Sequence, residues 1–127
     1  MFERHYVKTI VDRISETNNP LMQVVVGPRQ TGKSTMLGQA LAKVDMEHFF
    51  ISADDAIVPS EEWLQVEWQQ ARNATRLGSR PVVLVVDEIQ KVPHWSLVVK
   101  SLYDADRRND TPVRVVLSGS SSLLLHK

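Results

Sequence analysis

Short apolar runs alternate along the chain with amphipathic stretches, and this pattern predicts the order of its secondary structure. Four runs rich in β-branched residues predict strands, which cover residues 21–26, 48–52, 82–86 and 113–117. Apolar residues at helical spacing predict helices, which cover residues 3–16, 33–43, 61–78 and 93–107. When helices and buried strands alternate in this way, the helices pack on the faces of a parallel sheet. The sequence therefore predicts an α/β fold.

Two of these elements carry additional local signals. The serine at position 60 is suited to cap a helix, and Glu61 and Glu62 lie where the helix dipole favours negative charge. Gly78 is suited to end that helix, because glycine readily adopts a positive φ. The run Val82–Val86 is wholly apolar, so we expect this strand to be covered on both faces.

Composition limits the function classes. The chain has 127 residues, which suits one domain, with 15 basic and 15 acidic side chains and no cysteine. The lack of cysteine excludes disulfides and thiolate-bound metals, and the balanced charge gives no nucleic-acid signal. The apolar runs are far shorter than a membrane span, and the N-terminus opens no apolar signal region. We therefore expect a soluble, cytoplasmic protein with no membrane partner.

The strongest motif lies between the first predicted strand and the next helix. It reads Gly27-Pro28-Arg29-Gln30-Thr31-Gly32-Lys33-Ser34 and matches the phosphate-binding loop pattern G-x-x-x-x-G-K-[ST]. Glycines let the backbone curl so that its N–H groups point at phosphate oxygens, and the helix N-terminus attracts the same anion. We expect Lys33 to bridge the β- and γ-phosphates, Ser34 to bind Mg²⁺ and Thr35 to lie at the α-phosphate.

A pair of carboxylates follows the third predicted strand. Asp87 and Glu88 come directly after Val82–Val86, and buried carboxylates are costly unless they face a ligand or a metal. After a phosphate-binding loop, this pair is typical of a Walker B element. Asp87 would then hold Mg²⁺ through water, and Glu88 would polarise the water that attacks the γ-phosphate. The adjacent base favours hydrolysis over transfer of the phosphate to a second substrate.

A serine-rich turn ends the fourth predicted strand. In P-loop ATPases with an additional strand, the order is usually 5-1-4-3-2, so this strand lies between the phosphate-loop strand and the Walker B strand. That order would place Ser118 or Ser120 beside the γ-phosphate as a sensor. Which serine serves is left open.

Other candidate residues have simpler interpretations. Asp54 and Asp55 suit a solvated turn, and the four histidines lack metal-ligand spacing. Ser52 ends the strand expected next to Walker B and could restrain Glu88, but simple packing is the preferred interpretation.

Taken together, three motifs resemble one family. Gly27–Ser34, Asp87-Glu88-Ile89-Gln90 followed by Trp95, and Gly119-Ser120-Ser121 resemble the AAA-type ATPase domain of prokaryotic P-loop proteins that carry a C-terminal domain of unknown function. The resemblance implies a three-layer P-loop NTPase fold of the additional-strand, AAA-like type, with ATP as the nucleotide. It also implies a fifth strand and a second domain, so residues 1–127 are expected to form an N-terminal fragment truncated before the fifth strand.

The leading hypothesis is an ATPase that converts Mg·ATP to ADP and phosphate and couples this to conformational change in a missing C-terminal region. We expect slow turnover from the fragment, because the arginine finger that the family would supply does not follow the sensor turn. A nucleotide-dependent binding switch and a P-loop phosphotransferase are the alternatives. The partner, an unknown protein or effector domain, is not visible, and the full-length protein is a possible homo-oligomer.

Overall fold

The computed structural model describes residues 22–26, 33–78 and 80–119, and the expected helix 3–16 lies outside them. The elements follow the predicted alternation. In chain order they are β1 (Gln23–Val26), α2 (Lys33–Ala42), β2 (Glu47–Ser52), α3 (Glu61–Gly78), β3 (Val82–Asp87), the 3₁₀ turn η1 (Ile89–Lys91), α4 (Trp95–Arg108) and β4 (Val113–Gly119). No helix in these described ranges is long and apolar enough to cross a membrane.

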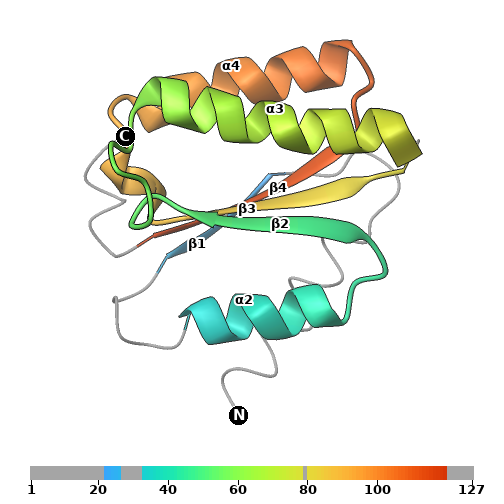
Figure 1. Ribbon diagram of the computed structural model, residues 1–127, viewed down its shortest axis with the longest axis horizontal. Coiled ribbons are helices and arrows are strands. Elements are labelled where there is room, and N and C mark those ends of the chain that lie inside the picture. Colours follow the sequence, from blue (N-terminus) through green and yellow to red (C-terminus); the bar gives the residue numbers. More distant parts are fainter. Residues whose placement is uncertain (1–21, 27–32, 79, 120–127) are drawn as a thin grey trace.

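The four described strands form one parallel sheet in the order β1-β4-β3-β2. Figure 1 shows α3 and α4 on one face of the sheet and α2 on the other. The α/β class, the three layers and the place of β4 between β1 and β3 are therefore confirmed. All carboxyl ends of the strands lie at one edge, on the left of Figure 1, where α2 begins and η1 follows β3.

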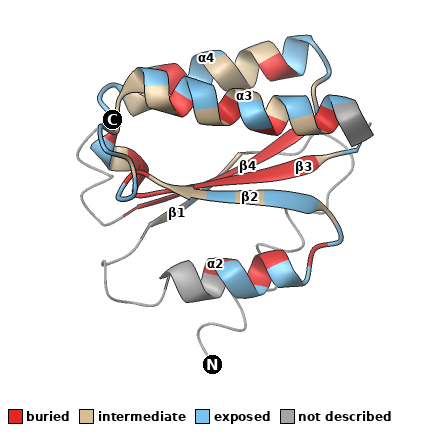
Figure 2. Ribbon diagram, viewed as in Figure 1, coloured by how far each residue is buried: buried red, intermediate tan, exposed pale blue. Residues whose placement is uncertain are grey.

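The centre of the sheet is buried on both faces, as expected. Every residue of β3 and β4 is buried, whereas β2 at the sheet edge is largely exposed or half-buried; Figure 2 shows the same contrast in colour. Alternate strand residues point to opposite faces, so the core has two parts. The larger part packs under α3 and α4 and includes Trp68 and Leu84, and the smaller packs over α2 and includes Leu37 and Val85.

Local signals placed the ends of α3 correctly. The Ser60 hydroxyl accepts a hydrogen bond from the Trp63 backbone N–H at 3.0 Å, which is the expected N-cap contact. The helix ends at Gly78. The helix expected from residue 93 instead begins at Trp95. His94 occupies the N-cap position, and its backbone, at φ 55° and ψ 31°, is not in the right-handed helical conformation.

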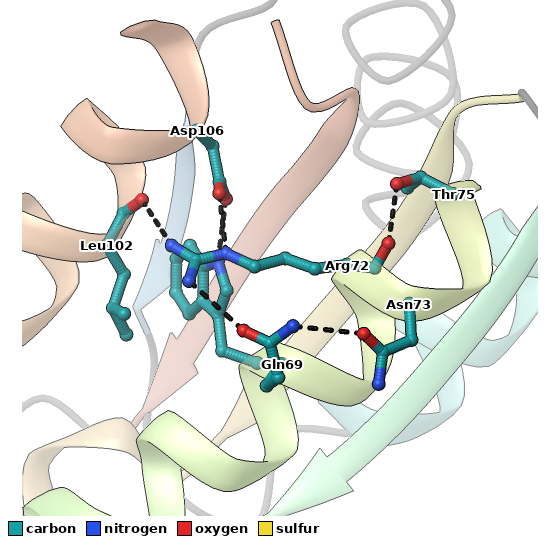
Figure 3. Close-up of polar contacts among 7 residues, drawn as sticks. Gln69, Arg72, Asn73, Thr75, Leu102 and Asp106 are labelled. Carbon is teal, nitrogen blue, oxygen red and sulfur yellow. Dashed lines mark hydrogen bonds and ion pairs between the residues drawn. The ribbon is translucent and has the colours of Figure 1, made fainter. Parts of the chain in front are cut away.

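A buried polar network joins α3 to α4 (Figure 3). The carboxylate of Asp106, only 4% exposed, accepts hydrogen bonds from Trp68 Nε1 at 2.7 Å and from Arg72 Nε at 2.6 Å. Arg72 also donates to the Leu102 carbonyl at 3.0 Å. Both carboxylate oxygens are thus satisfied and the charge is paired, which is the condition for a buried carboxylate to be tolerated.

We predict that Asp106→Ala lowers the free energy of unfolding by about 3 kcal/mol, because it leaves Arg72 and the Trp68 indole N–H without their acceptor. Urea unfolding followed by tryptophan fluorescence measures this. Asp104→Ala is the matched control on the same helix: the Asp104 side chain is 43% exposed, and its hydrogen bond with Lys100 lowers its pKa. Equal urea midpoints for the two variants would contradict the structural role of Asp106.

Candidate nucleotide site

The acidic pair and Ser118 meet at the carboxyl edge of the sheet. In the strand register Val86 pairs with Leu117 and Val25 pairs with Ser118. The next residue of β3, Asp87, therefore lies beside Ser118, and the end of β1 lies on the other side of β4. Ligands of open parallel sheets bind at this edge, outside the carboxyl ends of the strands.

Asp87 and Ser118 are in direct contact. The Ser118 hydroxyl donates a hydrogen bond to Asp87 Oδ1 at 2.6 Å. The serine is fully buried and the aspartate is 9% exposed, so this bond offsets part of the cost of removing the carboxylate from water. A carboxylate has two oxygens, and the Ser118 bond leaves Oδ2 to a second partner.

The end of β2 supports Asp87 through the backbone. The Ala53 N–H donates to the Asp87 carbonyl oxygen at 3.0 Å. Ser52 pairs with Asp87 in the register, but its hydroxyl accepts from the Asp54 N–H at 3.2 Å. The described hydrogen bond of Ser52 therefore lies within its own turn, in agreement with the packing interpretation.

Glu88 leaves the strand through an unusual backbone conformation. Its φ of 55° and ψ of 42° lie in the left-handed region, which is uncommon for a residue other than glycine. The side chain is buried, with 3% exposed, and its Oε2 accepts a hydrogen bond from Gln90 Nε2 at 2.8 Å. Strained backbone of this kind gathers at functional sites. From the sequence, Gln90 was assigned no role and appeared only as the last residue of the motif Asp87-Glu88-Ile89-Gln90.

The phosphate-loop residues 27–32 and Ser120 lie outside the described residues, as do the side chains of Lys33, Ser34 and Thr35. β1 ends at Val26, which pairs with Gly119, and α2 begins at Lys33. The end of β1 therefore lies at the edge of the sheet that carries Asp87.

The chemistry of this edge fits one magnesium ion. Mg²⁺ takes one or two protein oxygen ligands and keeps water and phosphate oxygens for the rest. Asp87 offers a buried carboxylate, and within the ranges described no three His, Asp or Glu side chains form a self-contained metal cluster. Asp54 and Asp55 are exposed, as expected for a solvated turn, and Asp54 forms an ion pair with Lys91.

This fold defines a class: it is the parallel α/β architecture of P-loop ATPases, with Asp87 at the end of β3 and Glu88 directly after it, at the carboxyl edge of the sheet. The model of the AAA domain family matches residues 19–127. The chain therefore belongs to the AAA domain family. This membership supports a nucleotide-binding, ATPase-type function.

Solved AAA structures share the fold. Cdc6p of Pyrobaculum aerophilum gives a TM-score of 0.70 at 14% identity, over 97% of this chain and 40% of that one. PCH-2 of C. elegans gives 0.61 at 15% identity, over 94% and 37%. A structure from a study of katanin self-assembly gives 0.59 at 21% identity, over 91% and 43%.

A sequence relative is similar along nearly the whole chain. It is the uncharacterized protein MJ1637 of Methanocaldococcus jannaschii, 27% identical over 136 aligned positions. The alignment takes in 99% of this chain and 27% of the relative. The chain thus spans about a quarter of the length of this curated relative and less than half of each solved structure named above.

We predict that Ser118→Ala lowers the free energy of unfolding by about 1–3 kcal/mol, because it removes the donor from a buried carboxylate. Ser101→Ala on the exposed face of α4 is the control and should change stability little. Urea unfolding of both variants provides the comparison. If the two midpoints both match that of the parent protein, the Asp87–Ser118 bond does not stabilise the fold.

Proposed function

We propose that the protein binds Mg·ATP and hydrolyses it to ADP and phosphate. The observation that carries the proposal is the arrangement at the end of β3. There Ser118 holds the buried Asp87, and the next residue, Glu88, turns out of the strand as a second buried carboxylate. Two adjacent carboxylates in different settings can take separate roles.

Different residues carry out different parts of the proposed reaction. Lys33 and the backbone N–H groups of residues 29–32 bind the phosphates, with Thr35 at the α-phosphate. Glu88 accepts a proton from a water molecule as the oxygen of that water attacks the γ-phosphorus. The bond between the γ-phosphorus and the bridging oxygen of ADP breaks, and the proton passes from Glu88 to solvent. Ser118 is the sensor that we favour, because it already contacts Asp87; Ser120 is the other candidate.

Magnesium belongs to the same proposal. Asp87 and Ser34 would hold the ion, which when bound neutralises charge on the β- and γ-phosphates. Ser118 fixes the Asp87 carboxylate in one orientation through Oδ1, and Oδ2 is the oxygen that we assign to the metal or its water.

We further propose that the chain is the nucleotide-binding part of a longer cytoplasmic protein. The alignment with MJ1637, which this chain spans for only 27% of its length, supports this. In that protein, hydrolysis would drive conformational change in an effector domain or protein partner. The study of katanin self-assembly supports testing the longer protein for homo-oligomers.

A nucleotide-dependent binding switch is the second candidate. It is favoured by the burial of Glu88, which is only 3% exposed, since a base shielded from water would give long-lived Mg·ATP complexes. Phosphate release without an added acceptor distinguishes hydrolysis from a phosphotransferase, and persistence of bound ATP distinguishes the switch.

We predict that Lys33→Ala removes Mg·ATP binding while the protein stays folded, because Lys33 is the charge assigned to the β- and γ-phosphates. Lys43→Ala is the matched control, since Lys43 is exposed just beyond the other end of α2. Calorimetric titration with Mg·ATP measures both affinities. Unchanged affinity of Lys33→Ala would refute the assignment of the phosphate-binding loop.

We predict that Asp87 and Glu88 variants fail differently. Glu88→Gln keeps the size of the side chain, so it should preserve Mg·ATP affinity while single-turnover hydrolysis falls by roughly 10²–10⁴-fold. Asp87→Ala should weaken Mg²⁺-dependent binding and hydrolysis together. Affinity and single-turnover rate measured on both variants test this. A Glu88→Gln protein that hydrolyses ATP at the parent rate would show that Glu88 is not the base.

A further inference from the structure

Gln90 lies in η1, two residues after Glu88, and its side-chain amide contacts the Glu88 carboxylate. The bond runs from Gln90 Nε2 to Glu88 Oε2 and is 2.8 Å long. We infer that Gln90 is a positioning residue, which orients Glu88 for its reaction with water. This inference rests on the proposed function, in which Glu88 is the base.

The contact depends on the local backbone. The side chains of residues two apart in sequence do not face each other on a helix. In a strand they project from the same face, roughly parallel to each other. Here the left-handed φ of Glu88 is followed at once by a tight turn, in which the Lys91 N–H donates to the Glu88 carbonyl at 3.1 Å. This reversal brings the amide of Gln90 back to the carboxylate of Glu88.

The orientation of the amide is decided by its partner. Only the NH₂ group can donate to a carboxylate, so Nε2 must face Glu88. The other end, Oε1, is buried and has no hydrogen-bond partner among the residues that the structure describes. An unsatisfied buried polar atom costs about 1–3 kcal/mol, so a half-satisfied glutamine is a poor choice for stability alone. Its one described hydrogen bond is the one to Glu88, which points to a role at that residue.

A fixed carboxylate has a clear use at a hydrolytic site. A base must lie within hydrogen-bond reach of the proton it accepts, and a small misplacement of a catalytic group costs a large factor in rate. The Gln90 bond restrains the plane of the Glu88 carboxylate through Oε2. Ser52, the residue that sequence reasoning considered for this task, is hydrogen-bonded to Asp54 instead.

The test is a double-mutant cycle. Gln90→Met keeps the length of the side chain and removes the donor, and it is made in the parent protein and in Glu88→Gln. In the parent we expect single-turnover ATP hydrolysis to fall roughly 10- to 100-fold at unchanged Mg·ATP affinity. In Glu88→Gln we expect no further fall, because Gln90 acts only through the base that this variant has already lost.

Two further variants complete the design. Gln70→Met, on the exposed surface of α3, is the matched control and should hydrolyse ATP at the parent rate. Gln90→Glu keeps the volume and replaces the donor with a second carboxylate, so it should also slow hydrolysis; it provides the answer if Gln90→Met fails to fold. Thermal unfolding of each variant shows which of them are folded.

The outcomes distinguish the positioning role of Gln90 from the role of Glu88 as the base. If Glu88→Gln is slow but Gln90→Met hydrolyses at the parent rate, the positioning role is wrong and the proposed function stands. A fall of equal size in both backgrounds also overturns the inference, because Gln90 would then act independently of Glu88. If Glu88→Gln hydrolyses at the parent rate, the proposed base is wrong and the inference fails with it.

Discussion

A carboxylate buried at the end of a parallel strand must find hydrogen-bond donors, and Asp87 finds one in Ser118 of the neighbouring strand. The contact exists because β3 and β4 are adjacent and pair in the register Val86 to Leu117. That register is itself held by strands that are buried throughout, under two helices on one face and α2 on the other. Because β4 lies between β1 and β3, the same serine also sits beside the end of β1. The sheet order thus brings the acidic pair to the edge where the phosphate-binding motif begins.

Asp87 and Glu88 are adjacent in sequence but are held by different parts of the fold. Asp87 is still in the strand and is supported from both sides, by Ser118 and by the backbone N–H of Ala53. Glu88 has left the strand in a left-handed conformation, which costs about 1–3 kcal/mol and persists only where the surroundings impose it. The contacts that hold Glu88 there include the η1 turn and the Gln90 amide. Each carboxylate is thereby oriented independently.

The two faces of the sheet are stabilised in different ways. On one face, Asp106 joins Trp68 and Arg72, so that α3 and α4 pack as a pair around a satisfied polar centre. On the other face, α2 packs through a small apolar cluster that includes Leu37 and Val85. This cluster sets the position of the helix whose first residue is Lys33. The apolar packing of α2 therefore fixes the position of this helix against the sheet.

The sequence by itself determined the elements whose signals are local. The apolar run at 82–86 predicted a strand covered on both faces, and Ser60 and Gly78 marked the two ends of α3, because capping depends on neighbouring residues. The contact of Ser118 with Asp87 depends on a register between strands that are far apart in the chain, so only the structure could show it. The choice between Ser118 and Ser120 as the sensor stays a prediction. The contact of Gln90 with Glu88 was not predicted at all. It depends on a positive φ at a residue that is not glycine, and only tertiary packing can impose that conformation.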